Sequence, residues 1–99
     1  MFVVALEFDL HIPDCHSLKQ KRGVVKPIVE GARRRYQVAA AEVDHHDKWQ
    51  RAGVGVAAVG ATAGHVAEVL DEVERFVWSF PEIQVLAADR RWLDDEEST

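Results

Sequence analysis

Two short clusters contain the side chains of this sequence that are best suited to metal binding. They combine imidazoles, the one thiol and neighbouring carboxylates: His11, Asp14, Cys15 and His16 in the first, and Asp44, His45, His46 and Asp47 in the second. These are the ligand types of a zinc site. However, no CxxC or HExxH spacing organises them, and the two clusters would have to meet in the folded chain. The pattern therefore favours solvated turn residues, with no metal and no cofactor.

Nucleophilic catalysis is the second chemistry to consider, with Cys15 as the nucleophile and His16 as its base. Adjacent residues in a turn seldom point at each other, and no glycine-rich loop accompanies them to stabilise an oxyanion. The glycines between Gly53 and Gly64 also lack the GK[S/T] ending of a phosphate-binding loop. We therefore expect a protein that is not an enzyme and has no small-molecule substrate.

Positive charge is concentrated between Ser17 and Arg35. This segment holds seven of the twelve Lys and Arg residues and one acid, Glu30, so it carries +6 while the other residues carry −11, for a net charge of −5. A chain with such segregated charge can present one basic face to a phosphate backbone although it is acidic as a whole. The predicted nucleic-acid-binding or partner-binding residues are Lys19, Lys21, Arg22, Lys26, Arg33, Arg34 and Arg35.

Helical spacing organises this basic segment. Apolar residues from Leu18 to Tyr36 recur with a period that predicts a helix over Ser17–Arg35, with Ser17 as its N-cap. Four of the cations then form one row along a flank of the helix: Lys19, Arg22, Lys26 and Arg33. Two interpretations remain open: the row binds RNA phosphates, or it forms weak ion pairs with an acidic second helix that carries Glu68, Asp71, Glu72 and Glu74.

Pro27 interrupts the predicted basic helix. It has no N–H to donate to the carbonyl of Gly23, and its ring crowds that carbonyl. We expect either a kink around Gly23–Pro27 or a helix that begins only at Pro27.

Hydrophobic patterning predicts the remaining elements. Strict alternation over Phe2–His11 is typical of a half-buried strand. Further strands are expected at Gln37–His45, with a bulge near Ala40–Glu42, at Trp49–Gly60 and at Ile83–Trp92, and a second helix at Thr62–Phe80. This order predicts an α+β, ferredoxin-like βαββαβ fold: a four-stranded antiparallel sheet ordered 4-1-3-2 with both helices on one face. Residues 1–93 form the expected domain, and residues 94–99 an acidic disordered tail.

Three segments also resemble a known family: HIPDCHSLKQKRGVVKP (11–27), VAAAEVDHHDKWQRAGVGVAAV (38–59) and HVAEVLDEVERFV (65–77). Together they are similar to the YlxP-like family of small bacterial proteins, over about residues 2–92. The resemblance implies a ferredoxin-like fold and a gene usually placed between those of a translation initiation factor and a ribosome-binding factor. It implies no established biochemical activity.

The predicted sheet has one face that no helix covers. Its central strands would show carboxylates and small residues rather than the aromatic rings on which RNA-recognition sheets stack bases, so RNA would be bound through its backbone by the first helix. The small apolar residues of this face, together with Trp49, are instead typical of an interface. The predicted interface residues are Val3, Ala5, Trp49, Gly53, Gly55, Ala57 and Val59.

Length and composition set the remaining limits. Ninety-nine residues with 47% apolar content suit one domain, and no apolar run is long enough to span a membrane. One cysteine agrees with a reducing compartment, so we expect a soluble, cytoplasmic protein. The favoured hypothesis is an accessory protein of translation or ribosome assembly that binds ribosomal RNA or a ribosomal subunit. The alternative is a protein–protein interaction module that forms a homodimer through its open sheet face or an edge strand, with the basic row engaging an acidic protein.

Overall fold

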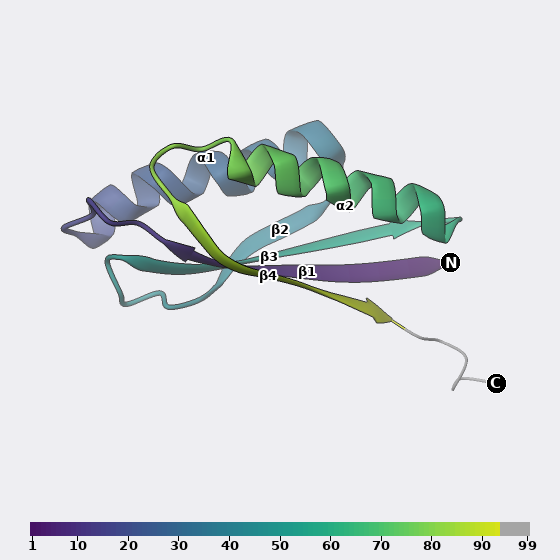
Figure 1. The fold of residues 1–99 in the computed structure, drawn as a ribbon, viewed down its shortest axis with the longest axis horizontal. Helices are drawn as coiled ribbons and strands as arrows, with labels where there is room; N and C mark the ends of the chain where they lie inside the picture. Colours follow the sequence, from purple (N-terminus) through teal and green to yellow (C-terminus); the bar gives the residue numbers. More distant parts are fainter. Residues whose placement is uncertain (94–99) are drawn as a thin grey trace.

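The computed structural model describes residues 1–93, which form one antiparallel sheet covered on one side by two helices (Figure 1). Along the chain, the elements are β1 (Phe2–His11), α1 (Leu18–Tyr36), β2 (Ala39–Asp44), β3 (Arg51–Gly60), α2 (Ala63–Trp78) and β4 (Gln84–Leu93). The strands are ordered β2-β3-β1-β4, which confirms the predicted fold class and strand order. The predicted tail, residues 94–99, lies outside the described residues.

Alternation in β1 directs Val4, Leu6, Phe8 and Leu10 into the core between the sheet and the helices. The same residues pair in register with the inward residues of β3, from Ala58 opposite Val4 to Ala52 opposite Leu10. Each helix closes this layer with one apolar stripe, which includes Val25 and Ile28 of α1 and Leu70 and Val73 of α2. None of the helices within residues 1–93 is long and apolar enough to cross a membrane.

The start of α1 is fixed by its N-cap. Ser17 has extended backbone geometry, and its Oγ accepts a hydrogen bond from the Gln20 N–H at 3.1 Å. Because α1 begins at Leu18, the alternative in which the helix starts at Pro27 is wrong. Pro27 is exposed and lies inside a continuous helix, so its ring projects to the solvent side. At the other end, Gln37 adopts a left-handed conformation (φ 54°) and its N–H bonds to the Arg33 carbonyl, which closes the last turn.

Replacing Ser17 with Ala is expected to lower the free energy of unfolding by about 1 kcal/mol, because the first turn of α1 then loses its side-chain acceptor. Urea denaturation followed by circular dichroism measures the change. A Ser17→Asp variant keeps an acceptor at the cap and should retain the stability of the natural protein. Equal losses in both variants would contradict the capping role.

Two irregularities interrupt the ladders of the sheet. The β2–β3 register shifts between Glu42 and Asp44, so the bulge lies at Val43, just beyond the predicted region. A second shift, between Asp9 and Leu10 in the β1–β4 ladder, was not predicted. Bulges increase local twist and re-aim side chains, and the first of these directs Val43 across the backbone of Gly55 on the open face of the sheet.

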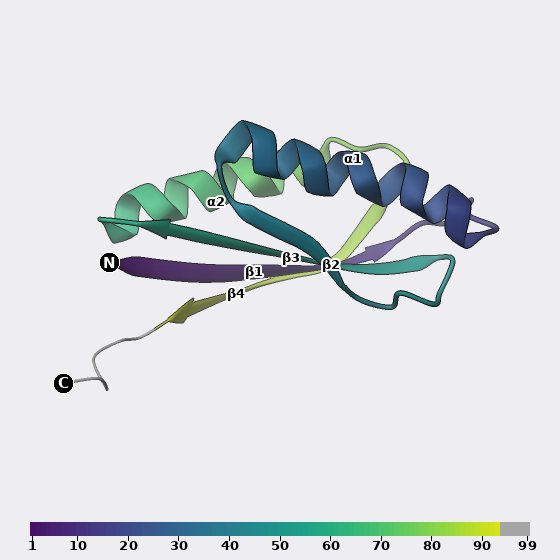
Figure 2. The same cartoon turned by 180° about the vertical axis from the view of Figure 1, so that it is seen from behind.

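The molecule measures 49 × 24 × 19 Å. The two helices are displaced from each other along its long axis (Figure 2). They meet near the C-terminal end of each, where the Phe76 ring packs edge-on against Tyr36 at 5.8 Å between centroids and closely against Gly31. The N-terminal half of α1 extends past the end of α2 (Figure 1). This displacement decides which charged side chains can reach each other.

Candidate nucleic-acid interface

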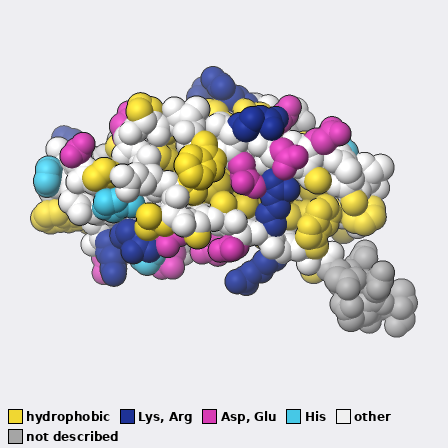
Figure 3. Space-filling view, in the orientation of Figure 1, with side chains coloured by type: hydrophobic (Ala, Val, Ile, Leu, Met, Phe, Trp, Pro, Cys, Tyr) yellow, Lys and Arg dark blue, Asp and Glu magenta, His cyan; other side chains and the backbone are white. Residues whose placement is uncertain are grey.

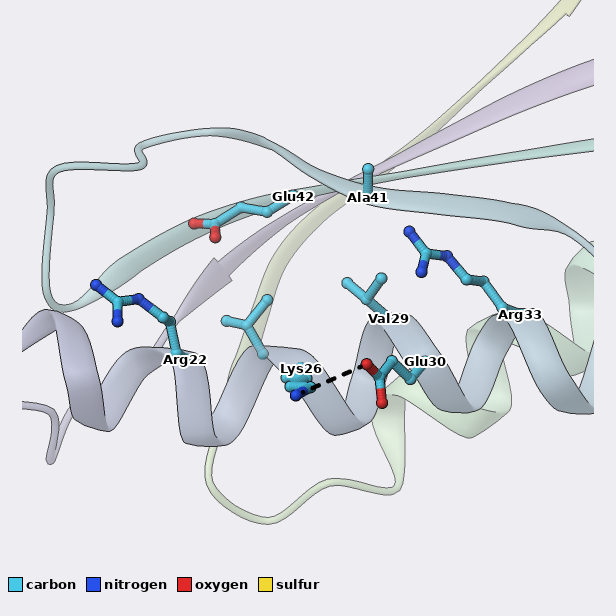
Figure 4. A pocket seen from close by; sticks show the side chains of 8 residues that line it. Arg22, Lys26, Val29, Glu30, Arg33, Ala41 and Glu42 are labelled. Atoms are coloured by element: carbon cyan, nitrogen blue, oxygen red, sulfur yellow. Dashed lines mark ion pairs between the residues drawn. The ribbon is translucent and has the colours of Figure 1, made fainter.

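The basic row of α1 lies on its outer flank, toward β2 and away from α2. Lys19, Arg22 and Lys26 are all exposed. Arg22, Lys26 and Arg33 line a groove of about 260 Å³ between α1 and β2, whose other wall includes Ala41 and Glu42 (Figure 4). From Lys19 to Arg33 the row spans about 21 Å at the rise of an α-helix. It is therefore an elongated basic surface, which we call the α1 row (Lys19, Arg22, Lys26 and Arg33).

Few acids neutralise the α1 row. Lys26 is 4.0 Å from Glu30 one turn along the helix, and both side chains are well exposed, so this ion pair contributes little. Lys19 and Arg22 have no ion-pair partner within residues 1–93. The positive charge of these side chains is thus available to a ligand.

Acidic side chains line α2 (Figure 3), and two of them are engaged by β4 rather than by α1. Asp71 and Glu74 bind Arg90 of β4 at 2.7 and 2.6 Å. Burial alone would lower the pKa of Arg90, but the hydrogen bonds and negative charges of the two carboxylates outweigh it and raise that pKa above its ordinary value. Between α1 and α2 the described residues form no ion pair, so the interpretation in which α2 neutralises the row finds no support.

Lys21 does not belong to this surface, contrary to the sequence-based expectation. Its side chain is only 2% exposed, and its ammonium donates hydrogen bonds to the carbonyls of His45, His46 and Arg51 at 2.7 to 3.4 Å. Glu42 Oε2 forms an ion pair with the same nitrogen at 2.9 Å, and this buried oxygen has no hydrogen-bond partner within the described chain. Lys21 therefore anchors the β2–β3 loop and cannot contact RNA.

The signal for this burial is present in the sequence. Lys21 precedes Val25 by four residues and Ile28 by seven, which places it on the apolar stripe rather than on the basic flank. A lysine on a buried stripe needs several acceptors for its ammonium, and the β2–β3 loop provides them.

The three arginines at the end of α1 diverge. Arg33 turns toward β2 and donates from Nε to the Ala40 carbonyl at 3.0 Å. Arg35 lies over the Phe76 ring, with its guanidinium carbon 5.1 Å from the ring centroid. Arg34 is exposed to solvent. Arg33 and Arg34 thus extend the basic surface, whereas Arg35 belongs to the contact between the helices.

Arg33 also protects the free edge of the sheet. On β2, the Ala40 carbonyl accepts from Arg33, and two residues later the Glu42 carbonyl accepts from His46 Nε2 at 3.1 Å. Alternate residues of an edge strand turn their polar groups away from the sheet, so these two side chains occupy carbonyls that another strand would otherwise bind. Edge strands protected in this way resist pairing with other chains.

The imidazoles and the thiol do not converge on one site. The Cys15 thiol is buried and donates to the Ser17 carbonyl, whereas His16 is exposed. His11 of the first cluster forms a hydrogen bond with Gln84. His45 of the second cluster lies near Asp9 and Asp44 instead. Within residues 1–93, no three His, Cys, Asp or Glu side chains are arranged to hold a metal ion.

The residues predicted for the interface are only partly on the open face of the sheet. Val3, Ala5, Gly55, Ala57 and Val59 share that face through the β1–β3 register. Gly53, opposite Asp9, lies on the same face but is buried beneath the close approach of Asp44. Trp49 is the exception, because it lies exposed in the turn between β2 and β3.

Two comparisons with known proteins agree with each other. A family model described as "Protein of unknown function (DUF503)" matches residues 3–90. The uncharacterized protein YlxP of Bacillus subtilis (strain 168) is 35% identical over 86 residues, which cover 87% of this chain and 94% of the relative. The family match includes the α1 row, the loop anchored by Lys21 and the sheet from residue 3 of β1 up to Arg90 of β4. YlxP is thus a relative of this chain, and the chain belongs to the DUF503 family.

Proposed function

We propose that this protein is a non-enzymatic accessory of translation or ribosome assembly that binds structured RNA through the α1 row. The observation that carries the proposal is the exposure of Lys19, Arg22 and Lys26 without compensating carboxylates from α2. Each such cation that contacts a phosphate releases counterions from the RNA, which is the main source of affinity for a polyanion.

The mode of binding follows from what the sheet lacks. On the open face, the central strands present Glu7 and Asp9 where an RNA-recognition sheet would carry aromatic rings. Asp9 is moreover held by Arg51 through two short hydrogen bonds of 2.8 and 2.7 Å. The α1 row would therefore read the backbone and shape of the RNA rather than its base sequence.

Two further observations support the remaining parts of the proposal. The separation of the buried Cys15 thiol from the exposed His16 argues against the nucleophile and base considered above, and thus for a protein without catalysis. The ribosomal part rests on the gene neighbourhood that the resemblance to the YlxP-like family implies.

A charge-reversal experiment tests RNA binding. Fluorescence anisotropy with a labelled ribosomal RNA hairpin should show that Arg22→Glu/Lys26→Glu weakens binding at least about tenfold, because two phosphate contacts become repulsive. For the natural protein, log K should fall against log salt with a slope of about −2 to −3 if three phosphates are contacted. Co-sedimentation with ribosomal subunits at low and high salt extends the measurement to the intact particle.

The matched control is Lys48→Glu/Arg75→Glu, which changes the net charge equally at two exposed positions outside α1. It should bind within about threefold of the natural protein, since only long-range electrostatics are altered. Equal losses for both double variants, or none for the α1 variant, would refute binding through this row.

A further inference from the structure

The open face of the sheet lies on the side away from both helices (Figure 2), and it carries exposed apolar residues. Val59 at 64%, Leu93 at 59% and Val43 at 50% are among the most exposed large hydrophobic residues. Between them lie small residues, and two shallow hollows of about 300 and 230 Å³ open over Ala5, Gly55 and Ala57. Such a contiguous patch is typical of an interface.

Three charges on this face have no partner within the described residues. Glu7 of β1 lies opposite Asp89 of β4, and Ala5, the next outward residue, lies opposite Arg91. All three charged side chains are exposed, and none is in an ion pair within residues 1–93. One cation thus adjoins two carboxylates, so the patch has charges of both signs available to a partner.

We propose that this face binds a second copy of the chain in a two-fold dimer. A two-fold axis that crosses the strands between the levels of Ala5 and Glu7 places Arg91 of each copy opposite Asp89 of the other. The same axis sets Ala57 of one copy against Gly55 of the other, so small residues meet and the sheets can approach closely. Arg91 and Asp89 are therefore self-complementary, whereas Glu7 of each copy lies opposite Ala5 of the other.

The area of the open face sets the size of the proposed interface. Four strands at a spacing of about 4.8 Å and a length of about 34 Å give a face of roughly 600 Å² per copy. A dimer would then bury about 1,200 Å² in total, at the low end of the range of specific interfaces. Apolar contact supplies the affinity, whereas the Arg91 and Asp89 pairs mainly fix the orientation.

The open face is favoured over an edge strand as the contact. At the free edge of β2, Arg33 and His46 already occupy the Ala40 and Glu42 carbonyls. Face-to-face packing also leaves both copies of α1 on the outside, so the dimer does not depend on RNA binding and does not obstruct it (Figure 1).

Sedimentation equilibrium over a concentration series tests the proposal. The natural chain should follow a monomer–dimer equilibrium, and Arg91→Glu should weaken it at least about tenfold because like charges then face each other. The exchanged variant Asp89→Arg/Arg91→Asp should return to within about threefold of the natural dissociation constant, since the pairs form again with reversed sign. Ala5→Lys, at an exposed position near the axis, should be monomeric and remain folded.

Arg75→Glu on α2 is the matched control, because it makes the same charge change at an exposed position away from the sheet. It should dimerise like the natural protein. The proposal is overturned if the natural chain stays monomeric up to about 1 mM. At that concentration, only a dimer with a binding free energy weaker than about 4 kcal/mol would escape detection. An Arg91→Glu variant that dimerises as well as Arg75→Glu also overturns the proposal.

Discussion

Replacing Lys21 with Met is expected to lower the free energy of unfolding by about 3 kcal/mol, a large part of the ~5–15 kcal/mol of a small domain. The ammonium is buried and binds two carbonyls of the β2–β3 loop, the Arg51 carbonyl at the start of β3 and the Glu42 carboxylate. Methionine fills a similar volume, so the loss reports the unpaired polar groups rather than a cavity. Urea denaturation monitored by circular dichroism gives the value.

A double variant separates the contribution of the unpaired Glu42 carboxylate to this loss of stability from the contribution of the unpaired carbonyls. Lys21→Met/Glu42→Leu removes both charges, so it should recover about 1 kcal/mol or more relative to Lys21→Met alone. The exposed neighbour Lys19 provides the control: Lys19→Met should change stability by no more than about 0.5 kcal/mol. If the Lys21 and Lys19 variants were equally stable, Lys21 would not be the anchor of the loop.

Replacing Gly31 with Leu is expected to lower the free energy of unfolding by about 2 kcal/mol, because the new side chain needs space that the Phe76 ring occupies. Leucine by itself favours a helix by roughly 1 kcal/mol over glycine, so the strain must exceed this gain. Phe76 also packs on Tyr36, Phe80 and the Arg35 guanidinium, which leaves its ring few places to move. Thermal and urea denaturation measure the loss.

Gly23 of the same helix offers the matched control. A Cβ at Gly23 has no neighbour within 4 Å, and the residue is exposed. Gly23→Leu should therefore leave stability unchanged or raise it by about 0.8 kcal/mol through helix propensity. A Gly31 variant as stable as the Gly23 variant would show that the contact between the helices is loose enough to accept a side chain.

The outward position of the α1 row and its separation from α2 have one structural cause. Phe76 of α2 contacts Gly31 and Tyr36 of α1, all toward the C-terminal ends of the two helices. Two carboxylates of α2, Asp71 and Glu74, bind Arg90 of β4 instead of the first half of α1. Both helices lie on one side of the sheet and leave its other face open, so the proposed RNA surface and the proposed dimer surface lie on opposite sides of the molecule (Figures 1 and 2).

Local periodicity determined much of this protein in advance. The alternation in β1, the apolar stripe of α1 and its Ser17 cap each depend on neighbours a few residues apart, which a sequence displays directly. The element order then restricted the sheet to few topologies, and the predicted strand order was confirmed. The concentration of cations between Ser17 and Arg35 was also a property of the sequence alone.

Only the tertiary structure decided which of those cations are available. Lys21 is buried because the β2–β3 loop, more than twenty residues away, closes over it and supplies its acceptors. Gly53 is covered because a bulge brings Asp44 onto it, and a bulge shifts the register that alternation assumes. Charge compensation depends on which helices lie side by side, and that is fixed by packing between distant segments rather than by any local pattern.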